Sequence, residues 1–304
     1  MSLDPTSGAS RRDEAREKAK QIREQHRKQQ RKTRLIVIAS VVALVLVVGT
    51  GGTFYLLNSR TPTGPGPVNM RSDGIVIGSG SEAVRTSATP AGQEPIATPV
   101  DEESDVISIQ MYVDYLCPIC KTFEETNGDQ IATWLDSGVA TVEIHPIPLL
   151  DRFSQGTKYS TRAVNAAACV ANSSPDQFYA FHQRLFVLQP EEGTPGLSDE
   201  ELVAAAKDSK VSSLGTITTC ITEQRFRPWV NQAKERALTG PIPNSDVVSV
   251  SGTPTIIVNG QQYTGAADDA QAFRQFVVKA AGTSFNESST PTPTPTPSAE
   301  VPAG

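Results

Sequence analysis

The sequence contains only four cysteines and three histidines in 304 residues, which limits the sites that it can build. A structural zinc site needs four cysteine or histidine ligands that meet in space. One cysteine pair is closely spaced, Cys117 and Cys120, but the other two cysteines are single and far away in sequence. The two histidines beyond residue 100 lack a paired spacing as well. We therefore expect no metal site, and no cofactor beyond a disulfide formed by the close cysteine pair.

Positive charge is scarce after residue 34. Residues 1–34 contain 11 Lys and Arg and 5 Asp and Glu, a net charge of +6; the whole chain carries −6, so residues 35–304 carry −12. Proteins that bind nucleic acids neutralise phosphates with lysine and arginine, and this acidic main part gives no reason to expect such binding. The leader also lacks the apolar a/d seam of a coiled coil. We interpret 1–34 as a basic cytoplasmic leader that sets topology.

One long hydrophobic run is present, the 23 residues from Leu35 to Leu57, and it contains no charged side chain. A bilayer core about 30 Å thick is spanned by about 20 such residues as a helix. The alternative is a cleavable signal peptide, whose apolar stretch is about 7–15 residues long. The run is longer than that, and no clean Ala-x-Ala site follows it. We predict a single-pass membrane anchor with a cytoplasmic N-terminus and an extracytoplasmic main domain.

Composition divides the rest of the exported part into three segments. Residues 58–104 are rich in Gly, Pro, Ser and Thr and are predicted to be a linker, with a candidate short strand at Gly74–Gly78. Residues 105–282 have the size and apolar content of one domain. Residues 283–304 include a Thr-Pro repeat and are predicted to form a disordered tail. No internal repeat is visible.

The domain is predicted to alternate strands and helices, the pattern of an α/β fold. Alternating apolar and polar residues indicate half-buried strands, and Asn259-Gly260 is a strong hairpin turn because both positions need positive φ. Asn127-Gly128 is a candidate helix interruption, and Gly138 a helix end. The expected elements are a strand over 106–113, a helix from Cys117 to about Leu135, a strand over 139–147, a helical block over about 155–245, a hairpin over 255–263 and a helix over about 267–280.

The motif Cys117-Pro118-Ile119-Cys120 lies where a strand ends and a helix begins. Unpaired N–H groups and the helix dipole favour an anion there, so the Cys117 pKa should be lowered. Cys120 lies one turn further along, which lets the two sulfurs meet. Pro118 is tolerated because a first-turn residue has no helical partner for its N–H. The alternatives are half of a zinc site and an inert structural disulfide; the strand–helix context favours a redox pair.

A second motif, Ser251-Gly252-Thr253-Pro254-Thr255, precedes an apolar strand. A proline at a strand start can mark a special turn or a cis bond, and an ordinary trans turn is the alternative.

Together the two motifs resemble a known family. Residues 113–123 and 252–260 are similar to the active-site region and the later proline loop of DsbA-type thiol–disulfide oxidoreductases, and the resemblance covers about 105–281. It implies a thioredoxin fold interrupted by a helical domain, with a cis Pro254 that faces the sulfurs. It also implies that the Thr253 backbone contacts substrate, that Cys117 is the exposed nucleophile and that Cys120 is its buried partner.

One position departs from the family pattern. The best-known members carry histidine after the motif proline, where this chain has Ile119. Because a histidine there helps to stabilise the thiolate, its absence leaves the redox potential open and favours a milder oxidant.

The remaining cysteines, Cys169 and Cys220, are 51 positions apart in the helical block. The alanine-rich stretch Ala166–Cys169 indicates close helix packing, and we interpret the two cysteines as a structural disulfide. Two buried thiols and a second redox pair are the alternatives. Membrane-anchored actinobacterial members are similar in carrying a second cysteine pair, and that resemblance implies a quinone-linked, VKOR-type membrane protein as the reoxidant.

The function expected from these features is the introduction of disulfides into unfolded exported proteins with free cysteines, by a monomer. One alternative is a reductase or isomerase; isomerases often dimerise through an added domain, and none is evident. Another is a thioredoxin-like binding module without catalysis. Four polar residues receive lesser roles: Asp114 and Tyr115 pack at the strand end or tune the motif, His145 is structural in its strand, and His182 lies on a helix surface.

Overall fold

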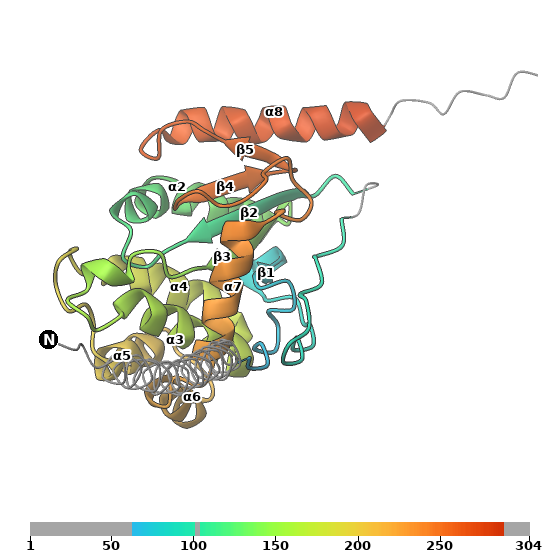
Figure 1. Cartoon of the computed structure of the whole chain (residues 1–304). Coiled ribbons are helices and arrows are strands. Elements are labelled where there is room, and N and C mark those ends of the chain that lie inside the picture. The colour runs from blue at the N-terminus through green and yellow to red at the C-terminus, as the bar shows by residue number, and fades with distance from the viewer. Residues whose placement is uncertain (1–62, 101–103, 289–304) are drawn as a thin grey trace, which may run out of the picture. The chain divides into compact units, whose positions relative to one another are not determined.

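A five-stranded sheet forms the centre of the domain in the computed structural model, which describes residues 63–100 and 104–288 (Figure 1). The strand order is β1-β3-β2-β4-β5. The strands are β1 (Ile75–Ile77), β2 (Ile107–Val113), β3 (Ala140–Pro146), β4 (Thr255–Val258) and β5 (Gln261–Tyr263). Only the β2–β3 pair is parallel among these strands, and the other neighbours are antiparallel. A parallel pair requires a crossover connection, which the helix between β2 and β3 provides.

The helices fall into two groups along the chain. The helix α2 (Pro118–Ser137) forms the crossover, and α8 (Ala270–Ser288) follows the β4–β5 hairpin. Five helices lie between β3 and β4: α3 (Tyr159–Ser173), α4 (Phe178–Val187), α5 (Asp199–Asp208), α6 (Leu214–Thr222) and α7 (Arg227–Thr239). The predicted α/β fold with an inserted helical domain at about 155–245 is therefore confirmed.

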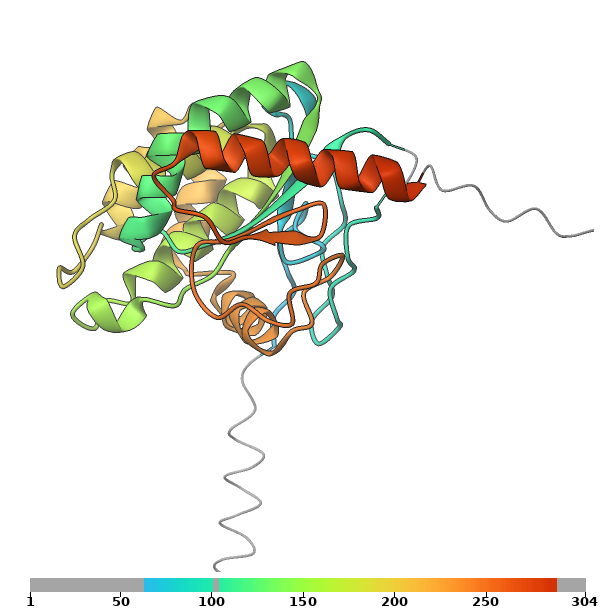
Figure 2. The same cartoon turned by 90° about the horizontal axis from the view of Figure 1, so that it is seen from above.

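The two faces of the sheet bury different helices because successive strand residues point to opposite sides. Ile109 and Met111 belong to the large core cluster that also includes residues of α2 and α8. Tyr112, the next residue, instead packs with Ile257 and with Ala237 of α7. Figure 2 shows α2 and α8 on one side of the strands and α7 on the other. Helices therefore cover both faces of the sheet at β2, the central strand that leads into the cysteine motif.

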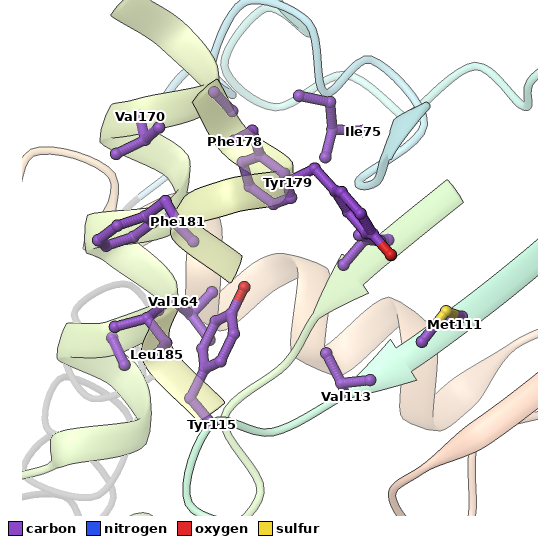
Figure 3. Packing of buried hydrophobic residues seen from close by; sticks show 14 of the residues in the cluster. Ile75, Met111, Val113, Tyr115, Val164, Val170, Phe178, Tyr179, Phe181 and Leu185 are labelled. Carbon is purple, nitrogen blue, oxygen red and sulfur yellow. The ribbon is translucent and has the colours of Figure 1, made fainter. Parts of the chain in front are cut away.

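The helical insertion packs around α3, whose residues are nearly all buried. The stretch Ala166–Cys169 allows close approach of neighbouring helices, and a disulfide joins Cys169 of α3 to Cys220 of α6. The predicted bond between Cys169 and Cys220 is therefore present. Figure 3 shows side chains of α3 and α4 reaching the end of the sheet, with Tyr115 beside Val164 and Leu185. The insertion therefore packs directly against the residues that precede the cysteine motif.

The segment 63–100 differs from the linker predicted over 58–104. Met70 and Ile75 are fully buried in the main core, and β1 extends the sheet by pairing with β3. Asp73 accepts two hydrogen bonds from the guanidinium of Arg236 and one from the indole N–H of Trp229. The composition is that of a linker, but hydrogen bonds and a few well-placed apolar residues hold the segment on the domain.

Two turn signals behave as predicted and one does not. Asn259 and Gly260 both have positive φ, 46° and 81°, and form the β4–β5 turn. Gly138 ends α2 with φ 72°. The candidate interruption at Asn127-Gly128 is wrong, because α2 continues through both residues and the Asn127 amide donates to the Ala267 carbonyl. A tertiary hydrogen bond thus stabilises a pair that favours turns in isolation.

The last helix is longer than predicted, and the predicted membrane anchor is not among the described residues. The last helix, expected over about 267–280, runs over Ala270–Ser288 and continues into the predicted tail of 283–304. The predicted anchor Leu35–Leu57 and leader 1–34 lie outside the described residues. Within 63–100 and 104–288, no helix combines the length and the apolar character needed to cross a bilayer.

Candidate active site

The cysteine motif lies at the junction of β2 and α2, as the sequence predicts. Cys117 is the residue that caps α2, and Pro118 is the first helical residue. The Cys117 N–H donates to the Asp114 carbonyl and the Lys121 N–H donates to the Cys117 carbonyl, so a turn leads directly into the helix. The N–H groups of the first helical turn have no partners within the helix and are available to a sulfur at its start.

The two cysteines of the motif differ in exposure. Cys117 is 5% exposed and Cys120 is fully buried, and both carry free thiols in this structure. Ile119, between them, is 58% exposed and lies at the surface rather than in the helix core. Both motif cysteines are therefore buried, and Cys117 keeps the only exposed fraction of the two. Cys117 is thus the less buried of the two sulfurs, but it is not the exposed one that the resemblance implies.

The acidities of the two thiols are driven apart. The hydrogen bond from the Cys120 thiol lowers the pKa of Cys117 to about 6, and the backbone N–H groups of Cys120 and Ile119 act in the same direction against the cost of burial. Burial raises the pKa of Cys120 well above its ordinary value, and the neighbouring Cys117 adds to this. Near neutral pH the pair therefore favours one thiolate, on Cys117, the less buried sulfur.

The proline loop lies against the motif although it follows more than 130 residues later. The Cys117 thiol donates to the Thr253 carbonyl at 3.2 Å, and the Thr253-Pro254 peptide bond is cis. The two segments meet because β2 and β4 are neighbours, with Tyr112 opposite Thr255. The loop thus presents the backbone of Thr253 beside the reactive sulfur, where an extended substrate chain could pair with it.

Asp114, three residues before Cys117, organises the loops around the motif. Its carboxyl group is fully buried and accepts hydrogen bonds from the Leu116, Leu149 and Leu150 N–H groups and from the Ser160 hydroxyl. Burial raises the pKa of Asp114 in spite of these donors. The residue therefore joins the β2–α2 loop to the segment after β3 and to α3, which is the strand-end packing role that the sequence indicates.

The prediction that His182 lies on a helix surface is wrong. Its side chain is fully buried on α4, with Nε2 2.9 Å from the Glu124 carboxylate and Nδ1 3.2 Å from the Tyr115 hydroxyl. The Phe178 and Phe186 rings lie beside it. The helix pattern could not show this, because the polar partners come from α2 and from the residue two places before Cys117.

Gln189, just after α4, is a second contact from the insertion that the sequence does not reveal. Its amide nitrogen donates to the carbonyls of Tyr115 and Cys117, at 3.1 and 3.0 Å. No motif or periodicity marks this residue, whereas Glu124 carries a weak signal because it lies one helical turn after Cys120. The helical insertion thus contacts the active-site turn through polar groups as well as apolar ones.

His145 is structural, as its position in a strand suggests. Its ring stacks on Tyr112 at 4.4 Å between centroids, and Nε2 lies 3.4 Å from the Glu143 carboxylate. Glu143 also accepts hydrogen bonds from the hydroxyls of Ser72 and Thr98, which belong to the segment before β2. In the part of the chain that the structure describes, no group of three or more Cys, His, Asp or Glu side chains could hold a metal ion.

Comparison with known proteins agrees with this geometry. A family model described as Thioredoxin matches residues 101–278. The DsbG disulfide bond oxidoreductase of Mycobacterium tuberculosis in its reduced form is 24% identical, with a TM-score of 0.52 over 72% of this chain and 93% of that one. Oxidised DsbA of the same organism is 25% identical, with a TM-score of 0.50 over 72% of this chain and all of that one.

A curated relative matches over a shorter stretch. The serine/threonine-protein kinase PknE of Mycobacterium tuberculosis is 32% identical over 118 residues, which are 38% of this chain and 20% of the kinase. The match therefore spans about a fifth of the length of the kinase.

The chain belongs to the thioredoxin family. Its helical insertion and its paired cysteines at the start of a helix place it with the DsbA-type thiol–disulfide oxidoreductases.

Proposed function

We propose that this enzyme is an extracytoplasmic oxidase that introduces disulfides into exported proteins through Cys117 and Cys120. The observation that carries the proposal is the difference between the two thiols. The pKa of Cys117, at the start of α2, is lowered to about 6, and the pKa of the fully buried Cys120 is raised. A stabilised thiolate favours the reduced form of the pair. The oxidised pair therefore has a tendency to accept electrons from substrate thiols.

The reaction takes place by two exchange steps. A substrate thiolate attacks the Cys117 sulfur of the Cys117–Cys120 disulfide, the sulfur–sulfur bond breaks and Cys120 leaves and takes up a proton, as its raised pKa favours. A second thiolate of the substrate then attacks the substrate sulfur of the mixed disulfide and releases Cys117 as a thiolate. The substrate loses two electrons and two protons in forming its disulfide, and the cysteine pair gains the electrons.

The surroundings of the enzyme follow from the sequence. The run Leu35–Leu57 anchors the chain in the cell membrane as a single span, and the excess of lysine and arginine in 1–34 keeps the N-terminus in the cytoplasm. The domain then acts, as a monomer, on unfolded exported proteins with free cysteines. A VKOR-type membrane protein returns the reduced pair to the disulfide.

The test is the redox equilibrium of the full-length protein in glutathione buffers, beside a Cys117→Ala variant. A potential well above that of thioredoxin, about −270 mV, with the transition absent from the variant, supports an oxidase. A potential near or below that value supports a reductase or isomerase instead. A Cys117–Cys120 bond that the buffers do not reduce contradicts catalysis and supports a thioredoxin-like binding module with a fixed disulfide.

A further inference from the structure

The amide of Gln189 holds two carbonyl groups of the active-site turn. It donates to the carbonyls of Tyr115 and Cys117, at 3.1 and 3.0 Å. A side-chain amide has two N–H donors, so both are used on this turn. Leu116, between the two carbonyls, donates its own N–H to the Asp114 carboxyl group. Gln189 therefore complements Asp114, since one residue fixes the N–H side of the turn and the other fixes the carbonyl side.

The backbone at Gln189 is itself held in place. Its N–H donates to the Phe186 carbonyl at 3.2 Å, in the last turn of α4. Pro190 follows, and a proline restricts the conformation of the residue before it. Seven residues earlier in the chain, His182 links α4 to the Tyr115 hydroxyl and to Glu124 of α2. The Gln189 amide thus reaches the turn from a support with little freedom to move.

The geometry matters for the sulfur because the Cys117 carbonyl begins the helix. The same carbonyl accepts the Lys121 N–H, the first hydrogen bond of α2, and the N–H groups of Ile119 and Cys120 act on the Cys117 sulfur. Without the Gln189 amide, the Cys117 carbonyl would keep only the Lys121 N–H as a partner. The turn would then be held less firmly, and so would the direction of the Ile119 and Cys120 N–H groups that follow Pro118. Any negative charge on the sulfur would then lose part of its stabilisation.

We propose that Gln189 is a positioning residue that keeps the Cys117 turn in the conformation that directs the first N–H groups of α2 at the Cys117 sulfur. The inference rests on the proposed exchange function and assigns to the helical insertion a part in setting the redox properties of the motif. The sulfur passes from disulfide to mixed disulfide to thiolate while Gln189 holds the turn in one shape.

The experiment compares three variants of the full-length protein. Gln189→Met keeps the length of the side chain without its donors, and Gln189→Glu replaces the donors with a carboxylate. Gln183→Met, within α4, is the matched control because the hydrogen bonds to the turn come from Gln189 and not from Gln183. For each we measure the Cys117 pKa from thiolate absorbance, the equilibrium constant with glutathione and the thermal midpoint.

The expected result is a raised Cys117 pKa in Gln189→Met and a reduction equilibrium constant lowered by up to about tenfold, or 1.4 kcal/mol. Gln189→Glu should show a larger change in the same direction, because its charge also repels the thiolate. Gln183→Met should leave both quantities as in the wild type. An unchanged pKa and equilibrium constant in Gln189→Met overturns the proposal, whether or not the thermal midpoint falls.

A measurement on the unaltered protein covers the case in which the variants do not fold. The side-chain NH₂ signals of Gln189 in an NMR spectrum should shift with the midpoint of Cys117 ionisation in the reduced protein. Signals that do not respond to that ionisation contradict the proposal. The wild-type redox transition is read separately, so its absence would overturn the proposed function while the Gln189 contact could still be tested.

Discussion

The two cysteine pairs of this domain lie in different environments. One pair forms a disulfide, and the other carries free thiols. Cys169 and Cys220 lie on facing helices of the insertion, are almost fully buried and form a disulfide. Cys117 and Cys120 lie one helical turn apart at the start of α2 and carry free thiols. Cys169 and Cys220 lie within α3 and α6, whereas Cys117 caps the start of α2.

The comparison shows that position relative to a helix decides the use of a cysteine. A thiolate at Cys117 is stabilised by a neighbouring thiol and by backbone N–H groups, which makes the bond to Cys120 easy to reduce. A disulfide between α3 and α6 closes a long loop and stabilises the fold by restricting the unfolded chain. The long separation of Cys169 and Cys220 therefore favours a stabilising bond, and the placement of Cys117 at a helix start favours exchange.

Removing the helical disulfide should produce the largest change in stability. The double variant Cys169→Ala, Cys220→Ala opens a loop of 51 residues, and loop entropy puts the loss at about 4 kcal/mol of unfolding free energy. Denaturant unfolding measures this directly. Exchange activity per folded molecule should stay near that of the wild type. Loss of activity in fully folded protein would show that the second pair also takes part in exchange.

The pH dependence should separate the two pairs next. Alkylation of the reduced protein should label Cys117 with a rate that rises around pH 6, while Cys120 stays unlabelled. Because the Cys117 pKa in the folded state lies below the ordinary value of 9.0, the thiolate stabilises the reduced fold at high pH. That stabilisation is lost as pH falls through 6. The free energy of unfolding should be measured for the reduced and the oxidised protein across pH 5–9. The value for the reduced protein should rise relative to that of the oxidised protein as pH rises.

The control for this measurement is the helical pair. Cys169 and Cys220 should stay unlabelled across the range in the absence of reductant. A labelling rate for Cys117 that rises only near pH 9 would remove the physical basis for an oxidase.

Substitution of Ile119, the residue between Pro118 and Cys120, should produce the smallest effect. Ile119→His places a group that can carry positive charge beside the Cys117 sulfur, so the Cys117 pKa should fall and the reduction equilibrium constant with glutathione should rise. Because the Ile119 side chain is 58% exposed, solvent screens the charge, and an effect of about 0.3–1 kcal/mol is expected. Ile119→Asn is the neutral control. An equal shift in both variants would assign the change to polarity rather than to charge.

Several parts of the fold could be predicted from local patterns. Alternation located β2 and β3, Asn259-Gly260 located the hairpin, and Gly138 located the end of α2. These signals are local because strand burial, turn geometry and helix ends depend on neighbouring residues. The same reasoning was wrong at Asn127-Gly128, where a hydrogen bond to the distant Ala267 carbonyl outweighs a local preference for turns.

The sequence by itself determined the chemistry of this protein. Two cysteines one turn apart at a strand–helix junction, and a Thr-Pro loop before a strand, suffice to predict a reactive thiol pair. Only the tertiary structure decided what surrounds that pair. His182 is buried against Glu124, and Gln189 binds the active-site turn, because helices that are distant in sequence pack on the end of the sheet. Such contacts are not encoded in any local pattern, since each partner is an ordinary polar residue until the fold brings the two together.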